Sequence, residues 1–432
     1  MFTGTNIQPF ENKIWLATPT MHKEELEYIH EAFDKNWITT AGENITSLED
    51  SVSNFMGGGK DEKKQLYCVG LSSGTAAIHL ALKLAGLTTN PTARFTDGLL
   101  RNQHVFVSDM TFNASVNPIV YEGGIPVFID SEAETWNMDP EALERAFQLY
   151  PNVKVVIVAD LYGTPADLPR IRSICDKHGA VLIEDAAESL GATIEGRKTG
   201  TFGDYNILSF NGNKIITGSS GGMLLCFDRL AADRVRKWST QAREAAPWYQ
   251  HEELGYNYRI SNIIAGIARG QMLHIGEHIA RKRMIYERYR EGFKDLPVKM
   301  NSYLPNTTPN FWLSCLLIDR SAMCKQVRSE HDVLYTPEAG RSCPTEILEV
   351  LARHNAEGRP IWKPIHLQPL YRSNGFITAM GNGRAQTDAY INHTVSVVDE
   401  DVFERGLCLP SDIKMNESEQ DKVIEIIKNC FS

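Results

Sequence analysis

Between residues 65 and 228, short apolar runs alternate with segments whose apolar residues recur at helical spacing. Seven of the runs predict β-strands, and amphipathic segments at 73–86, 140–149 and 167–178 predict helices between them. The predicted strands are residues 67–71, 104–110, 125–130, 153–162, 180–185, 205–210 and 222–227. Runs that are apolar on both faces and separated by helices indicate a mainly parallel sheet covered on both sides. In such sheets ligands bind at the carboxyl ends of the strands.

The remainder of the chain predicts a second, smaller unit. Residues 21–35 predict a helix near the start, and residues 259–292 predict one long helical stretch. We therefore expect a large α/β domain over residues 15–265 and a smaller C-terminal α/β domain over residues 266–432, with the long helix linking them. Residues 87–103 are expected to form an excursion between a helix and a strand.

Composition and charge exclude several classes of protein. The chain of 432 residues is 42% apolar and 23% charged, as in folded globular proteins. Its net charge of −10 argues against a nucleic-acid partner. No stretch approaches the roughly 20 apolar residues of a membrane helix, and the first residues lack the pattern of a signal peptide. Eight cysteines without CxxC spacing are expected to be buried thiols, so we expect a cytoplasmic protein.

Three features at predicted strand ends carry candidate chemistry. Asp185 ends one strand, and Lys214 follows the next in a loop rich in Gly, Ser, Thr and Asn. Residues 71–75 join a strand to a helix, whose first N–H groups and positive dipole end form an anion site. An anion site, a carboxylate and a lysine at one sheet edge describe a pocket for pyridoxal 5′-phosphate (PLP). There the lysine would form the imine, and the carboxylate would keep the pyridine nitrogen protonated.

Each feature also has an ordinary structural explanation. Ser-Gly-Thr at a helix start is a common N-cap, and Asp185 could cap the helix that follows it. A single lysine after a strand is usually a surface residue. His274 and His278 are spaced as a metal-binding pair, but no third ligand accompanies them, so we expect no metal site. Neither a Walker A motif nor GxGxxG is present, which disfavours nucleoside-triphosphate and dinucleotide enzymes.

Seven motifs in order, spread from about residue 15 to 410, resemble the DegT-type family of PLP-dependent nucleotide-sugar aminotransferases. They lie at residues 72–82, 109–130, 183–192, 200–224, 254–266, 362–366 and 406–411. The resemblance implies a type I PLP-transferase (aspartate aminotransferase-like) α/β fold, whose large domain has a mainly parallel seven-stranded sheet. It also implies a homodimer with shared active sites.

Roles for individual residues follow from the same resemblance. Lys214 would be the Schiff-base lysine, and Asp185 would bind the pyridine nitrogen. Phe112 would stack on the cofactor ring, while Glu188 would approach its phenolic oxygen. Gly74, Thr75 and Ser209 would bind the cofactor phosphate, and Asn257 would reach the phosphate of the neighbouring subunit. Thr39 and His366 would bind the nucleotide-sugar.

The activity implied is transfer of an amino group from L-glutamate to a 4-keto-6-deoxy nucleotide-sugar. The lysine loop resembles that of members acting at C4 of UDP-linked N-acetylhexosamines. A C3-specific aminotransferase shares every motif, and the nucleotide and the axial or equatorial product stay open. Dehydratases of the family replace the lysine by histidine, so Lys214 argues against that reaction. A binding protein on a catalytically inactive copy of the fold is the remaining alternative.

Overall fold

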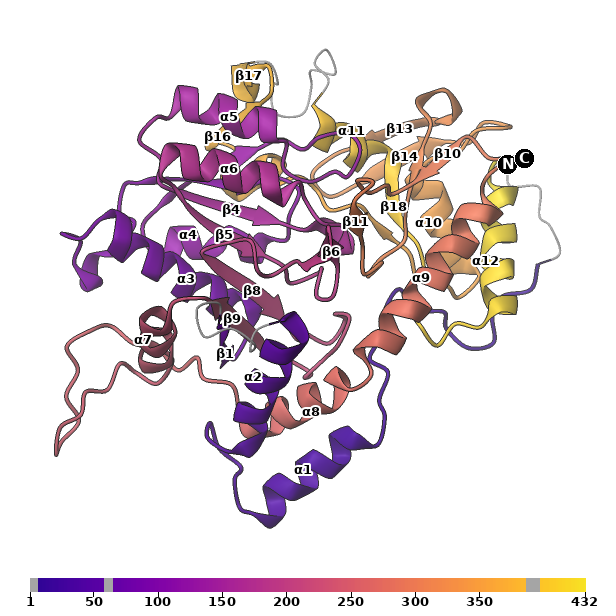
Figure 1. Cartoon of the computed structure of the whole chain (residues 1–432). Coiled ribbons are helices and arrows are strands. Elements are labelled where there is room, and N and C mark those ends of the chain that lie inside the picture. Colours follow the sequence, from indigo (N-terminus) through magenta and orange to yellow (C-terminus); the bar gives the residue numbers. More distant parts are fainter. Residues whose placement is uncertain (1–6, 58–64, 386–396) are drawn as a thin grey trace.

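The computed structural model describes residues 7–57, 65–385 and 397–432. A nine-stranded sheet with helices on both faces forms its larger part, and a smaller four-stranded sheet with its own helices lies beside it (Figure 1). The strand order of the large sheet is β1-β9-β8-β5-β4-β2-β3-β16-β17, and pairing from β8 to β16 is parallel. Its strands are β1 (Tyr67–Leu71), β2 (His104–Ser108), β3 (Ile125–Ile129), β4 (Val155–Ala159), β5 (Val181–Asp185), β8 (Tyr205–Ser209), β9 (Gly222–Cys226), β16 (Gly375–Thr378) and β17 (Gly381–Asn382).

Alternate residues of the central strands supply cores on opposite faces of the sheet. Val105 and Val107 pack in one core, whereas Phe106 between them packs in another. The first face is covered by α3 (Gly74–Thr89), α4 (Asn117–Tyr121) and α7 (Arg229–Ser239). The opposite face is covered by α2 (Glu43–Met56), α5 (Pro140–Leu149), α6 (Leu168–His178) and α8 (Asn262–Met272). Burial on both faces explains why these strands are continuously apolar in sequence.

The C-terminal part has its own core. Its antiparallel sheet has the order β10-β12-β18-β15 and packs against the long helices. The strands are β10 (Val298–Met300), β12 (Cys315–Ile318), β15 (Arg359–Pro360) and β18 (Gly406–Cys408), and the helices are α9 (Ile275–Gly292), α10 (Pro344–Arg353), α11 (Val398–Arg405) and α12 (Glu417–Asn429). Smaller sheets pair β6 (Thr193–Ile194), β7 (Arg197–Lys198) and β11 (Thr307–Thr308), and β13 (Lys325–Arg328) with β14 (Val333–Thr336).

All seven predicted strands are present, but the sheet has nine. β16 pairs in parallel with β3, so a segment from the C-terminal half completes the sheet of the first half. Its four residues are too few to show a periodic pattern in the sequence. The domain boundary at residue 265 stays a prediction. β16 and β17 follow that boundary in the sequence but belong to the larger sheet.

The long helix predicted over residues 259–292 is broken into α8 and α9. At the break, the N–H groups of Leu273 and His274 bond to carbonyls three residues back, which tightens the turn and ends α8. Helix α1 (Glu24–Asp34) packs across α8 at Gly270, where an added Cβ would lie 2.8 Å from the backbone nitrogen of Glu25. In the described ranges, no helix is both long and apolar enough to span a bilayer.

Candidate active site

A cavity of about 970 Å³ opens at the carboxyl ends of β5 and β8, next to the first turn of α3. Its lining includes Gly74, Asp185, Ser209 and Lys214, of which the first and the last are 140 positions apart in the sequence (214 − 74). The parallel strands bring these side chains to one edge of the sheet. The structure therefore joins the predicted anion site, carboxylate and lysine in one pocket.

The anion-binding end of the pocket is the start of α3. Ser73 is the N-cap, and its hydroxyl accepts a hydrogen bond from the Ala76 N–H at 3.0 Å. An added Cβ on Gly74 would lie 3.2 Å from Cβ of Ser209, so glycine lets the helix start approach the end of β8 closely. Thr75 also lines the cavity. The first N–H groups of α3 and the Ser209 hydroxyl suit a phosphate.

Asp185 is held in a short chain of hydroxyl groups at the base of the cavity. Its Oδ2 accepts from the Ser115 hydroxyl at 2.6 Å, and Ser115 lies 2.7 Å from the hydroxyl of Thr111. Its Oδ1 accepts from the Ala187 N–H at 3.2 Å. Burial raises the pKa of Asp185, although the Ser115 hydrogen bond and the nearby Lys214 charge oppose this shift. A cationic ring nitrogen beside Asp185 would favour its ionised form further.

Lys214 is positioned by groups from two other parts of the chain. Its Nζ lies 3.1 Å from Oε1 of Glu188 and 4.4 Å from the centre of the Trp312 ring. The Trp312 indole donates to the carbonyl of Asn213 at 2.7 Å, which holds the lysine loop. Glu188 Oε2 accepts from the Tyr162 N–H at 2.8 Å. Burial raises the pKa of Glu188, and the lysine charge counteracts that shift.

The mouth of the cavity is aromatic and charged. Phe112 is 60% exposed, and its ring lies 5.6 Å from that of Trp362. Arg359 and Lys363 also line the cavity, and they pair with glutamates at 2.6 and 3.5 Å. Phe112 is thus free to cover a flat ring bound below it, while the cations suit an anionic group that reaches outward.

Three of the predicted site residues lie outside the cavity lining. Thr39 is exposed, and its carbonyl accepts from the Asn262 N–H at 2.8 Å. Asn257 is also exposed and forms an isolated antiparallel bridge with Thr240. His366 is fully buried elsewhere. The roles given to Thr39, Asn257 and His366 stay predictions.

His366 belongs to a closed cluster of acidic side chains. Its Nδ1 bonds to Asp109, its Nε2 lies 3.1 Å from Glu400, and its ring stacks on Phe376 at 3.9 Å. Burial opposes a charge on the ring, but Asp109 and Glu400 outweigh it and raise the pKa of His366 to about 9. Both ring nitrogens are therefore engaged inside the protein.

Sequence reasoning missed Ser115, Tyr162 and Trp312. Ser115 lies within the motif at residues 109–130, three residues after the ring-stacking candidate Phe112. Trp312 lies in an apolar run that reads as core, and its contact with Lys214 joins residues far apart in the sequence. The one sequence feature that could have pointed to Ser115 is its spacing of four residues from Thr111, a spacing at which side chains can meet.

The donor set of the cavity fits PLP. A helix N-terminus and a serine hydroxyl suit the phosphate, a buried carboxylate suits a protonated ring nitrogen, and the amine of Lys214 lines the same cavity. Because Gly74 has no side chain, the start of α3 and Ser209 lie close together at the phosphate end. The cavity volume of about 970 Å³ exceeds the needs of the cofactor alone, so a second ligand has room.

Comparisons with known proteins agree with this assignment. EpsN from Bacillus subtilis, assigned to the PLP-dependent aminotransferases, is 40% identical over 424 residues, covering 97% of this chain and 96% of EpsN. GDP-perosamine synthase from Vibrio cholerae is 29% identical and covers 96% of this chain and 98% of its own length. The PLP form of Spr1654 from Streptococcus pneumoniae, assigned as a sugar aminotransferase, shares the fold, with a TM-score of 0.78, 21% identity and coverage of 97% and 98%. Residues 19–428 match the DegT/DnrJ/EryC1/StrS aminotransferase family, and the chain belongs to that family of PLP-dependent sugar aminotransferases.

Proposed function

We propose that this aminotransferase moves an amino group from L-glutamate to C4 of a UDP-linked 4-keto-6-deoxy sugar, for surface polysaccharide or glycan synthesis. The observation that carries the proposal is the meeting of Lys214, Glu188 and Asp185 in one cavity with an anion site at the start of α3. The cavity also has a mouth with two cations, which suits the diphosphate of a nucleotide-sugar.

The bound cofactor supplies a carbonyl that takes up the amino group and a ring that withdraws electrons from the reacting carbon. We propose Lys214 Nζ as the atom to which the cofactor attaches. Once released, Nζ would take the proton from the donor carbon and pass it to the cofactor in the first half-reaction. In the second half-reaction it would take a proton back from the cofactor and deliver it to the acceptor carbon. Glu188 Oε1, at 3.1 Å, orients the amine between these transfers.

The remaining cavity residues bind and orient. Asp185, held by Ser115 and the Ala187 N–H, accepts a hydrogen bond from the ring nitrogen and keeps it protonated. Gly74, Thr75 and Ser209 bind the phosphate, and Phe112 covers the ring. Phe112 lies exposed at the mouth of the cavity, between the interior and the solvent. Its ring would therefore help to exclude water from the reacting carbon once a substrate is bound.

We further propose a homodimer in which Asn257 and Thr39 serve the cavity of the second copy. Both side chains are exposed and lie outside their own cavity lining, which a shared site would explain. The eight cysteines are free and buried, as suits a reducing compartment, so we propose the cytoplasm. For His366 a substrate contact would require its acidic cluster to open.

The test is the visible spectrum of the purified protein before and after L-glutamate, followed by mixing with keto-sugars linked to UDP, dTDP or GDP. We expect a yellow band that bleaches with glutamate and returns with a UDP-linked 4-keto sugar, whose product carries nitrogen at C4 by NMR. Return only with a GDP-linked sugar, by analogy with the Vibrio cholerae relative, would replace the UDP assignment. Nitrogen at C3 would establish the C3-specific alternative, and a protein inert to PLP and glutamate would establish the binding-only alternative.

A further inference from the structure

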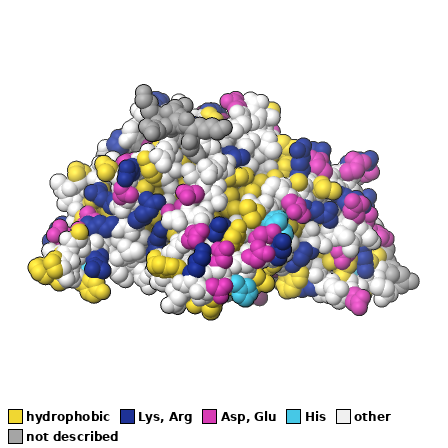
Figure 2. Space-filling model, turned by 60° about the horizontal axis from the view of Figure 1, so that its bottom comes forward, with side chains coloured by type: hydrophobic (Ala, Val, Ile, Leu, Met, Phe, Trp, Pro, Cys, Tyr) yellow, Lys and Arg dark blue, Asp and Glu magenta, His cyan; other side chains and the backbone are white. Residues whose placement is uncertain are grey.

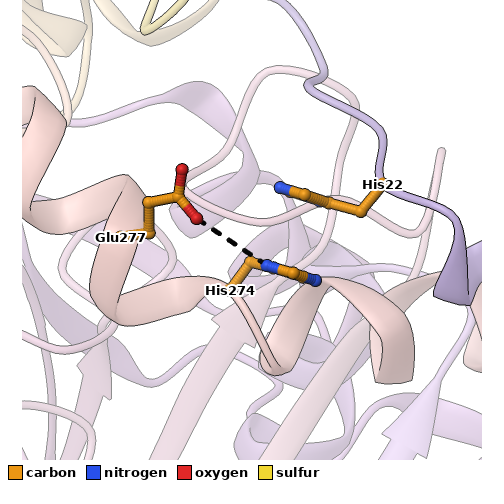
Figure 3. Close-up of side chains that lie close together, drawn as sticks. All are labelled: His22, His274 and Glu277. Atoms are coloured by element: carbon orange, nitrogen blue, oxygen red, sulfur yellow. Dashed lines mark ion pairs between the residues drawn. The ribbon is translucent and has the colours of Figure 1, made fainter.

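The corner between α8 and α9 brings together histidines that the proposed function does not use. His274 lies in the link between the two helices, and His22 from the segment before α1 stacks on it. The ring centres are 3.5 Å apart and the planes differ by 1°. Figure 3 shows the carboxylate of Glu277, from the first turn of α9, facing the same space. His278 is not part of this group, and its Nδ1 lies 3.0 Å from the carbonyl of Ile215. His22 joins His274 through a tertiary contact, which the sequence spacing did not show.

The geometry brings one donor atom of each residue near a common point, and the two parallel rings must turn before all three donors are directed at it. A nitrogen of His22, a nitrogen of His274 and a carboxylate oxygen of Glu277 all lie within 4.8 Å of one another. The His274 Nδ1 is 3.8 Å from Glu277 Oε2, as the dashed line in Figure 3 marks. The side chain of Glu277 is 75% exposed and that of His274 is 23% exposed, so an ion can reach the point from solvent.

The other nitrogen of each ring faces its own carboxylate. His274 Nε2 lies 3.2 Å from Glu24, and His22 Nδ1 lies 3.4 Å from Glu25. Carboxylates in this position orient metal-binding imidazoles and raise their basicity. With Glu277 they make three acidic groups around two imidazoles, which favours a cation. In Figure 2, histidine and acidic side chains gather near the middle of the face turned forward.

We propose that His22, His274 and Glu277 bind a first-row divalent metal ion of the Zn²⁺ class. Two imidazoles and one carboxylate suit Zn²⁺ and leave a fourth position for water. Coordination turns the two rings out of their parallel stack, because a metal lies close to the plane of each imidazole that binds it. The ion would clamp residues 20–22 to the α8–α9 corner. Residues 15–18 of the same segment line the active-site cavity, so the clamp would hold one of its walls.

The test is a titration of untagged holoenzyme, stripped with EDTA and desalted, with Zn²⁺ in competition with a chromophoric chelator. We expect one Zn²⁺ per chain, with affinity at least about tenfold weaker in His274→Asn and Glu277→Gln. His331→Asn is the matched control, because His331 is an exposed histidine in the turn between β13 and β14. Its affinity should equal that of the original protein.

Glu277→Gln keeps the test decisive if a histidine variant fails to fold, since its side chain is largely exposed. At the same Zn²⁺ concentration, the melting temperature should rise more in the original protein and in His331→Asn than in Glu277→Gln. Absence of stoichiometric binding, or equal affinity in Glu277→Gln and His331→Asn, would overturn the site and leave His274 as an ion-paired histidine only. These readouts do not depend on transamination, so failure here leaves the proposed function untouched.

Discussion

Two regions of this protein bury carboxylates beside a basic side chain, and they differ in access. At the strand ends, Asp185 and Glu188 lie near Lys214, and all three line an open cavity. In the second region, Asp109 and Glu400 hold His366, which has no exposed surface. In the first region the carboxylates and the basic side chain surround a space for a ligand. In the second region they bond to one another.

The difference shows what each arrangement can do with buried charge. A lysine that keeps access to a ligand can exchange its carboxylate partner for a reacting group, so its electrostatic environment can serve chemistry. The histidine has both ring nitrogens occupied, so its charge contributes to folding alone. Nearby burial also raises the pKa of Asp130 to about 7, which makes this cluster sensitive to pH.

The largest effect should come from replacing the cavity lysine. Lys214→Ala should fold and bind the cofactor's amine form but lose more than about 10³-fold in glutamate-dependent turnover, because the proton carrier is removed. Steady-state assays with the keto-sugar substrate measure the loss. Lys299→Ala, an exposed lysine on β10, is the control and should keep full activity. Substantial turnover by Lys214→Ala would reject its catalytic role.

Asp185→Asn keeps the shape of the side chain and removes its charge. We expect kcat to fall by about 10²- to 10³-fold, the range seen when one electrostatic contact to developing charge is lost. The absorbance of bound cofactor should persist, because the phosphate site at Gly74 and Ser209 is unchanged. Asp97→Asn, an exposed aspartate in the excursion before β2, provides the matched control. An unchanged kcat would show that Asp185 does not act on the ring nitrogen.

The His366 cluster should make the free energy of unfolding depend on pH. The pKa of His366 is about 9 when folded, against an ordinary value near 6.5, so its stabilisation is complete below about pH 6.5 and lost as pH rises to 9. This loss amounts to about 3 kcal/mol of unfolding free energy. The neighbouring carboxyl groups of Asp130 and Asp399, whose pKa values burial raises, also destabilise the fold as pH rises, and Arg384 faces the same cluster.

His366→Gln should remove the His366 part of that slope between pH 6.5 and 9, as measured by urea unfolding at several pH values. Its KM for the nucleotide-sugar should stay unchanged at a pH where the variant is folded. His331→Gln controls for the loss of a histidine. A raised KM with unchanged stability would instead support the sequence-based prediction that His366 binds substrate, and the contrast between the two regions would fail.

The smallest effect should come from the contact between the two halves of the chain at the lysine loop. Trp312→Phe keeps an aromatic ring near Lys214 but removes the hydrogen bond to the Asn213 carbonyl. A single bond of this kind is worth about 1 kcal/mol, so kcat should fall by about fivefold while cofactor affinity stays the same. Trp248→Phe, in an exposed position, is the control. An unchanged kcat would show that the lysine loop needs no support from Trp312.

Much of the large sheet and the main chemistry could be predicted from the sequence. Strands buried on both faces appear in the sequence as apolar runs. The polar residues that end these strands, such as Asp185, mark the sheet edge where ligands bind. Lys214 and the start of α3 at Gly74 could be placed for the same reason, since a strand end and a helix start are local features.

Tertiary structure alone decided contacts between segments without a common local pattern. β16 is too short to show periodicity, yet pairing with β3 gives its backbone groups partners in the sheet. Trp312 reads as core in the sequence, and packing of the C-terminal part against the lysine loop brings its ring to Lys214. His22 and His274 are joined only by the packing of α1 across α8. Local sequence determines which groups lie at a strand end, whereas the groups that face them across the cavity depend on long-range packing.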